Sequence, residues 1–169
     1  MRVGVLTIST AGSRGERNDT SGDAIVSWAE SRHYVIAERR LVSDDANEIV
    51  RVLMSWADGE VADLVLTTGG TGLSPTDVTP EATSAVLERD APGFSEWVRV
   101  STASRFPRAI LSRGRSGVRH RTLIINLPGS TGGVTDALAA LEPVLEHAVA
   151  VMQGTVVEHG PGPITGNVG

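Results

Sequence analysis

The feature that most constrains this chain is the alternation of short apolar strands with helical segments. Three runs rich in Val, Leu and Ile, at residues 2–9, 62–68 and 122–127, are typical of buried strands. Residues 34–42 alternate polar and apolar side chains, which is typical of a half-exposed or edge strand. Strands that alternate with helices predict a mostly parallel sheet covered on both faces, and therefore an α/β protein.

Between these strands, apolar side chains at helical spacing predict helices. Residues 46–57 have the clearest amphipathic pattern, and residues 135–152 form the longest predicted helix. Residues 109–118 are broken by glycine and predict either a hairpin or an irregular crossing. The remaining predictions are a polar loop over residues 10–20 and three shorter helices, at residues 21–32, at residues 80–89 with Thr79 as N-cap, and at residues 93–101.

Length and composition suit one folded domain. With 169 residues, of which 40% are hydrophobic, the chain can fill a single core, and we expect the domain to span residues 1–153. Residues 154–169 hold five glycines and two prolines and are expected to form a flexible tail. The apolar run near the N-terminus is too short for a secretory signal or a membrane span, which predicts a cytoplasmic protein with no membrane partner.

Missing residue types exclude several kinds of chemistry. All 15 residues counted as Lys or Arg are arginine, so Schiff-base catalysis and a phosphate-loop lysine are excluded. There is no cysteine, which excludes disulfides, thiolate nucleophiles and thiolate-bound zinc or iron–sulfur clusters. The four histidines are too scattered along the sequence to form a paired metal motif.

The arginines are concentrated in one acid-free stretch. Residues 97–135 contain seven arginines and no acid, within a chain whose net charge is −5. Such a stretch favours an anionic ligand. An arginine-mediated RNA-binding protein is the least favoured alternative, because Phe106 is the only aromatic residue between Arg99 and Thr135 and no stacking series accompanies the arginines. We therefore expect no nucleic-acid partner.

Glycine-rich and polar loops follow the predicted strands, at the carboxyl edge where ligands bind in parallel α/β folds. Residues 69–72 (Gly-Gly-Thr-Gly) let a phosphate approach backbone N–H groups, or they simply form a tight turn. Residues 128–133 either present the N–H groups of a helix start to an anion or only begin that helix. Asp44 and Asp45 follow the second strand and are helix N-caps or carboxylates that bind Mg²⁺ or orient a nucleophile.

Six segments together carry a resemblance that is more specific than any one loop. They are TTGGTGLSPTDVTPEAT (67–83), PGFSEWVR (92–99), AILSRG (109–114), TLIINLPGSTGGVTDAL (122–138), DTSGDAI (19–25) and LVSDD (41–45). Through them the chain resembles the Mog/MoaB family of molybdenum cofactor biosynthesis proteins, which also supplies the G domain of gephyrin-like proteins. The resemblance extends over residues 2–152, essentially the whole predicted domain.

This resemblance implies a fold, an assembly and an activity. The implied fold is a three-layer α/β/α sandwich with a mostly parallel sheet, and the implied assembly is a homotrimer. The implied activity is that of a molybdopterin adenylyltransferase, in which Mg²⁺-ATP and molybdopterin give adenylyl-molybdopterin and pyrophosphate. Mg²⁺ is the implied cofactor, and a downstream molybdate-insertion enzyme is the implied protein partner.

The family's functional residues carry over onto matching positions of this chain. Its two functional carboxylates fall on Asp44, which we assign to Mg²⁺-ATP as a metal ligand, and on Asp77, which we assign to the pterin phosphate. The implied substrate-binding residues are Gly69, Gly70, Thr71, Gly72, Ser112, Arg113, Pro128, Gly129 and Ser130.

One position departs from the family pattern. Many members have an arginine directly before the loop aspartate, where this chain has Thr76. The phosphate contacts would then come from elsewhere, with Arg113 as the predicted source. The departure also supports an alternative function, a non-catalytic molybdopterin-binding or scaffold protein of the same fold.

Overall fold

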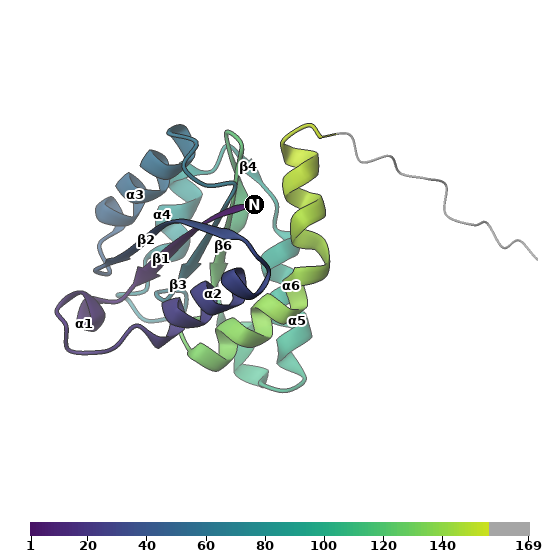
Figure 1. Cartoon of the computed structure of the whole chain (residues 1–169). Coiled ribbons are helices and arrows are strands. Elements are labelled where there is room, and N and C mark those ends of the chain that lie inside the picture. The colour runs from purple at the N-terminus through teal and green to yellow at the C-terminus, as the bar shows by residue number, and fades with distance from the viewer. Residues whose placement is uncertain (156–169) are drawn as a thin grey trace, which may run out of the picture.

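The computed structural model describes residues 1–155 and shows within them a six-stranded sheet of order β2-β1-β3-β6-β5-β4 (Figure 1). The strands are β1 (Arg2–Ile8), β2 (Val35–Val42), β3 (Leu64–Thr68), β4 (Arg89–Asp90), β5 (Ser116–Arg119) and β6 (Thr122–Leu127). Strands β2, β1, β3 and β6 run parallel, whereas β5 is antiparallel to β6 and β4 is antiparallel to β5. The predicted mostly parallel sheet is confirmed, with β2 at one edge as expected.

Helices cover both faces of the sheet, which confirms the three-layer α/β/α sandwich (Figure 1). The helices are α1 (Thr10–Ser13), α2 (Thr20–Ser31), α3 (Ala46–Asp58), α4 (Thr79–Val86), α5 (Gly93–Ala103), the 3-10 helix η1 (Pro107–Leu111) and α6 (Thr131–Met152). Apolar residues of α2, α5 and α6 pack on one face of the sheet, and those of α3 and α4 pack on the other.

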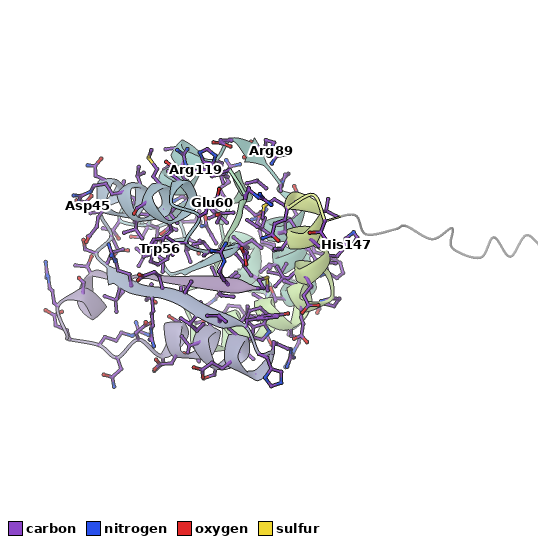
Figure 2. All side chains as sticks on the ribbon, turned by 45° about the horizontal axis from the view of Figure 1, so that its top comes forward. Asp45, Trp56, Glu60, Arg89, Arg119 and His147 are labelled. Atoms are coloured by element: carbon purple, nitrogen blue, oxygen red, sulfur yellow. The ribbon has the colours of Figure 1, made fainter. Side chains whose placement is uncertain are left out.

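The two hydrophobic cores follow directly from the alternation of side chains along each strand. In β3, Leu66 faces the core beneath α2, α5 and α6, while its neighbour Val65 faces the core beneath α3 and α4. Trp56 is 3% exposed and reaches from α3 onto the sheet, where it covers Gly4 (Figure 2). Burial of each such large apolar side chain contributes about 1.5 to 3 kcal/mol relative to an exposed position.

Several element boundaries differ from the sequence-based predictions. Thr79 was predicted to be the N-cap of α4, and this is wrong, because Val78 occupies that position and Thr79 is the first helical residue. The Thr79 hydroxyl instead donates a hydrogen bond to the Gly69 carbonyl oxygen, so a contact with the preceding loop replaces the cap. Helix α4 also ends at Val86, before the predicted end at residue 89, because Arg89 joins the short strand β4.

Two further segments contain structure that the sequence pattern did not predict. The loop predicted over residues 10–20 includes the short helix α1, which begins because Ser9 accepts a hydrogen bond from the backbone N–H of Gly12. The segment predicted as a hairpin or an irregular crossing, residues 109–118, contains the end of η1 and most of β5, which pairs with β6 as a hairpin. Nearly all of the predicted tail, from residue 156 onward, lies outside the described residues. Within residues 1–155 no helix is long and apolar enough to cross a membrane.

Candidate active site

The loops after β1, β3 and β6 meet at the carboxyl edge of the sheet. Gly69 has a φ of +99°, and a Cβ atom there would lie 2.2 Å from the carbonyl oxygen of Ile8 at the end of β1. A Cβ atom on Gly129, in the loop after β6, would lie 3.1 Å from the Cα of Gly69. Thr68 ties the last two loops together, because its hydroxyl donates a 2.6 Å hydrogen bond to the Pro128 carbonyl oxygen. The predicted convergence of these loops is confirmed.

Backbone geometry requires glycine in the middle of the β3 loop. Gly70 has a φ of +62°, a region that L side chains rarely adopt, and a Cβ atom there would lie 2.4 Å from the Thr79 hydroxyl. Thr79 holds the loop at two points, through its hydroxyl bond to Gly69 O (2.9 Å) and its backbone N–H bond to Gly70 O (3.1 Å). Helix α4 therefore fixes the shape of this loop.

Two neighbouring cavities lie beside the loop that contains Gly70. The larger, which we call the Asp77 cavity, has a volume of about 620 Å³ and is lined by residues 70–72, Asp77, α5, η1 and the start of α6. The smaller, which we call the Asp44 cavity, has a volume of about 220 Å³ and is lined by the end of β1, residues 17–21 and Asp44. Gly70 and Gly129 line both cavities, so the two cavities adjoin at these glycines.

The structure separates the roles of the two adjacent aspartates after β2. Asp45 caps α3, because its Oδ1 accepts hydrogen bonds from the backbone N–H groups of Asn47 (2.8 Å) and Glu48 (3.0 Å). Asp44 takes no part in this cap and lines the cavity instead. Its Oδ2 accepts two hydrogen bonds from Thr10, while its Oδ1 lies toward Gly70 and accepts none within the described residues. Asp44 thus presents a free carboxylate oxygen at the cavity.

Asp77 is held in the turn that precedes α4. Its Oδ2 accepts a 2.9 Å hydrogen bond from the backbone N–H of Ser74, and its own N–H donates to the Ser74 carbonyl oxygen. A Cβ atom on Gly72 would lie 2.8 Å from the same Oδ2, so the carboxylate lies directly against the glycine loop. Thr76 next to it is exposed, hydrogen-bonded to Ser74, and lines neither cavity.

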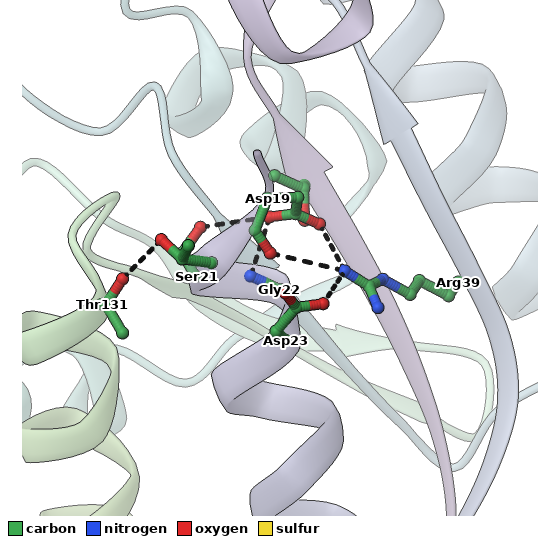
Figure 3. A network of polar contacts seen from close by, with 8 residues as sticks. Asp19, Ser21, Gly22, Asp23, Arg39 and Thr131 are labelled. Carbon is green, nitrogen blue, oxygen red and sulfur yellow. Dashed lines mark hydrogen bonds and ion pairs between the residues drawn. The ribbon is translucent and has the colours of Figure 1, made fainter. Parts of the chain in front are cut away.

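A third carboxylate, which the site predictions missed, organises the Asp44 cavity. Asp19 lines this cavity, and its Oδ2 accepts a hydrogen bond of 2.8 Å from Thr7 at the end of β1. The same oxygen accepts a second bond, of 2.9 Å, from Arg39 of β2, and Figure 3 shows Arg39 directed at Asp19. The adjacent Thr20 lies within hydrogen-bond distance, 2.8 Å, of Thr131 at the start of α6. This network joins four elements around the cavity. Its only sequence signal is the Asp-Thr-Ser-Gly segment (19–22), in which Asp19 caps α2 and the next three residues begin it.

The N-terminus of α6 opens onto the Asp77 cavity. Ser130 caps this 22-residue helix by accepting a hydrogen bond from the backbone N–H of Gly133, and Ser130, Gly132 and Gly133 all line the cavity. Helix N-termini attract anions because their first N–H groups lack partners within the helix. The loop at residues 128–133 therefore begins the helix and also lines the cavity, while the binding of an anion there stays a prediction.

The structure divides the seven arginines of residues 97–135 among three places. Arg99, Arg105 and Arg108 line the Asp77 cavity. A separate groove, which we call the outer groove, is bordered by Arg99 together with Arg113 and Arg115. Arg119 and Arg121 lie at the far end of the sheet. Arg119 forms an ion pair with Asp58 in the last turn of α3. Asp45 caps the opposite end of the same helix, and Figure 2 shows that Arg119 and Asp45 lie far apart. Arg105 and Arg108 were not predicted as site residues.

Ser112 and Arg113 lie beside the glycine loop, as the carry-over of residues predicts. Ser112 lines the Asp77 cavity, and the backbone N–H of Arg113 donates a 2.8 Å hydrogen bond to the Thr71 carbonyl oxygen. The Arg113 guanidinium, however, lines the outer groove and not the cavity. A phosphate contact by Arg113 stays a prediction.

A mostly parallel sheet with two adjoining cavities at its carboxyl edge, each lined by aspartates, places the chain among the α/β proteins whose ligand sites lie in the loops after the strands. The chain belongs to the molybdenum cofactor biosynthesis family, because residues 4–147 match the family model described as "Probable molybdopterin binding domain". The resemblance of its motifs to the Mog/MoaB proteins is thereby confirmed.

Relatives align with nearly the whole chain. The molybdopterin adenylyltransferase of Helicobacter pylori strain J99 is 36% identical over 165 residues, which cover 94% of this chain and 91% of the relative. Among solved structures, the molybdopterin biosynthesis enzyme MoaB of Thermus thermophilus is 49% identical, with a TM-score of 0.86 over 90% of this chain and 96% of that one. The Mog protein of Mycobacterium ulcerans is 39% identical, with a TM-score of 0.84 over 89% and 97%.

Proposed function

We propose that this protein is a molybdopterin adenylyltransferase that transfers AMP from ATP to the terminal phosphate of molybdopterin. The observation that carries the proposal is the placement of Asp44 and Asp77 in neighbouring cavities that share Gly70 and Gly129. Two phosphorylated substrates can approach each other only where such cavities meet. Relatives that cover nearly the whole chain and are named as this enzyme support the same activity.

The reaction needs positioning and charge neutralisation more than a protein nucleophile. An oxygen of the molybdopterin phosphate forms a bond to the α-phosphorus of ATP. The bond from that phosphorus to the bridging oxygen breaks, and pyrophosphate leaves with the electron pair. Most of the catalytic effect in phosphoryl-type transfers comes from alignment and electrostatic stabilisation. A chain without lysine or cysteine can supply both through carboxylates, arginines and backbone N–H groups.

Asp44 fits the role of the metal ligand in this proposal. Its Oδ1 lies at the cavity without a hydrogen bond among the described residues, while Thr10 fixes the other oxygen. No cluster of three metal-ligating side chains occurs within residues 1–155. This donor set suits Mg²⁺, which commonly binds one or two carboxylates together with substrate phosphates and water. Bound with ATP, Mg²⁺ would neutralise phosphate charge.

The Asp77 cavity suits the pterin substrate and its phosphate. It is the larger of the two, and its wall includes the apolar side chains of Val98, Phe106 and Leu111. Arg108 is exposed at this cavity and makes no hydrogen bond or ion pair with the described residues, so its guanidinium is available to a phosphate. The N-terminus of α6 offers a second anion-binding group on the same side.

The proposal is tested by incubating the protein with molybdopterin, Mg²⁺ and ATP and measuring adenylyl-molybdopterin and pyrophosphate. Asp44→Asn and Asp77→Asn are each expected to lower turnover by about 100-fold or more, because each removes a charge aimed at the reacting phosphates. Asp45→Asn is the matched control, since asparagine caps helices as well as aspartate does. Full turnover in both Asp44→Asn and Asp77→Asn would reject the assignment.

The same experiment distinguishes the non-catalytic alternative. A pterin-binding or scaffold protein would bind molybdopterin and form no ATP-dependent product. The absence of an arginine at Thr76 was the sequence feature in favour of that alternative. Thr76 lines neither cavity, so its hydroxyl contributes to neither site, and the measurement of product decides between the two functions.

We further propose a homotrimer in which α5 and η1 contribute to the subunit contacts. These two elements expose large apolar side chains, with exposed fractions of 53% for Trp97, 68% for Val100 and 66% for Ile110. Such a concentration marks a protein contact surface. Sedimentation analysis should give three times the chain mass, and Val100→Asp should dissociate the assembly. We also expect the enzyme to act in the cytoplasm, where ATP is available, and to deliver its product to a molybdate-insertion enzyme.

A further inference from the structure

We infer that Arg113 and Glu81 form a positioning pair that holds the loop carrying Asp77 in its active shape. In this inference Arg113 acts on the reaction through the loop, in place of the direct phosphate contact that the sequence predicts for it. This inference rests on the proposed adenylyl transfer, and it assigns to Glu81 a role that no motif in the sequence suggested.

Arg113 donates hydrogen bonds to three backbone carbonyl groups of the loop. Its backbone N–H donates to Thr71 O at 2.8 Å, its Nε donates to Gly72 O at 2.8 Å, and its Nη2 donates to Asp77 O at 2.6 Å. These carbonyl groups belong to both ends of the segment that leads from the glycine loop to the catalytic carboxylate. One residue thus bridges the start and the end of that segment.

Glu81 completes the arrangement from the first turn of α4. Its carboxylate forms an ion pair with Arg113 Nη1, and its Oε2 accepts a second bond from Nη2 at 3.4 Å. The hydrogen bond from Arg113 lowers the pKa of Glu81, so the carboxylate stays charged. The guanidinium is therefore anchored to α4 while it holds the loop. All three of its nitrogen atoms have partners within the protein.

The direction of approach separates this role from substrate binding. Arg113 and Glu81 line the outer groove and not the cavity, whereas Asp77 lines the cavity. All three guanidinium nitrogens of Arg113 are already bonded to the loop or to Glu81. The arginines that do line the cavity are Arg99, Arg105 and Arg108.

Lysine is the substitution that distinguishes the two roles. A lysine ammonium can still bind a phosphate as a point charge, but it cannot direct fixed N–H groups to Gly72 O, Asp77 O and Glu81 at once. A positioning arginine is therefore sensitive to Arg113→Lys, whereas a phosphate-binding arginine tolerates it better.

The test measures kcat and the KM for each substrate in Arg113→Lys, Glu81→Gln and the double variant. We expect Arg113→Lys to lower kcat by about 10- to 100-fold, the effect of a small misplacement of a catalytic group, with little change in either KM. Glu81→Gln should lower kcat in the same direction, and the double variant should be no worse than Arg113→Lys. Arg115→Lys is the matched control, because Arg115 lines the same groove without a side-chain hydrogen bond or ion pair among residues 1–155.

Hydrogen exchange of the amides from Gly72 to Asp77 gives a readout that does not depend on turnover. Faster exchange in Arg113→Lys and Glu81→Gln, but not in Arg115→Lys, supports the positioning pair. Unchanged exchange overturns it, as does an Arg113→Lys variant with wild-type kcat and a raised KM. If the wild-type protein forms no product, the proposed function fails, while the exchange experiment still decides whether the pair shapes the loop.

Discussion

The Thr10 hydroxyl donates a 2.7 Å hydrogen bond to Asp44 Oδ2, and the backbone N–H of Thr10 donates a second bond of 2.8 Å to the same oxygen. The backbone N–H of Asp44 donates in return to the Thr10 hydroxyl at 3.1 Å. These bonds join the start of α1 to the end of β2, across 34 residues of sequence. They fix one carboxylate oxygen, while the other accepts no hydrogen bond from the described residues.

Thr10→Val is expected to lower kcat about tenfold, because it removes a hydrogen bond to a charged group that contributes about 1.5 to 3 kcal/mol. Valine keeps the shape of threonine and the backbone N–H bond to Asp44. It also leaves the Asp44 backbone N–H without the hydroxyl that accepts its bond, so the free energy of unfolding should fall as well, and kcat is compared on the folded variant. Ser13→Ala is the control, since among residues 1–155 the Ser13 hydroxyl forms a single hydrogen bond, to the Thr10 carbonyl oxygen. Equal kcat values for the two variants would show that the Thr10 hydroxyl does not orient Asp44.

Gly69→Ala is expected to lower the free energy of unfolding by at least about 2 kcal/mol. Its φ of +99° is unfavourable for alanine, and the new methyl group would meet the backbone carbonyl of Ile8, which cannot turn aside as a side chain can. Gly132→Ala is the matched control, because nothing lies within 4 Å of its Cβ position and its φ is not positive. It lies in the first turn of α6 and should gain about 0.4 to 1 kcal/mol. Urea unfolding of both variants measures the difference.

The sequence predicts the fold well because the fold depends on local patterns. Apolar runs predict β1, β3 and β6, and the edge position of β2 follows from its polar alternation. Helix boundaries are less predictable where a distant contact replaces a local signal. Thr79 is the example, because its hydroxyl bonds to Gly69 and so leaves α4 without a side-chain cap.

The candidate site could be predicted only in part, for a similar reason. Asp44 and Asp45 are adjacent aspartates that the sequence pattern alone cannot tell apart. The structure distinguishes them, because Asp44 is bonded to Thr10 and lines a cavity. Motif resemblance identified Asp44, whereas it had no means to identify Arg108, whose position depends on how η1 packs against α5. The charge of the arginine stretch was visible in the sequence, but its division between cavity, groove and far end was not.

Arg108→Ala is expected to raise the KM for molybdopterin about tenfold, since it removes one charge-assisted contact to a phosphate at a solvent-exposed position. The KM for ATP should change less, because Arg108 lines the Asp77 cavity and not the Asp44 cavity. Added salt should raise the molybdopterin KM of the wild type more steeply than that of the variant. Arg121→Ala is the control, as Arg121 bonds to the Gln153 carbonyl oxygen far from the site. Identical KM values in the two variants would remove Arg108 from the proposed site.

Tyr34 is the single tyrosine of the chain, so its ionisation can be followed without interference from other tyrosines. Burial, together with the 2.7 Å hydrogen bond that its hydroxyl donates to Glu146, raises its pKa from 10.0 to about 12. The raised pKa means that the folded state favours the neutral phenol. The resulting stabilisation is complete below pH 10 and is lost as the pH rises toward 12.

Ultraviolet absorbance of tyrosinate should therefore show one transition near pH 12 in the folded protein. Glu146→Gln should move that transition toward lower pH, because it removes the carboxylate that accepts the phenol proton and repels the phenolate. Tyr34→Phe should abolish the signal and serves as the assignment control. A transition at the ordinary value of 10.0, with helical circular dichroism intact, would show that Tyr34 is not held between α2 and α6 as the structure has it.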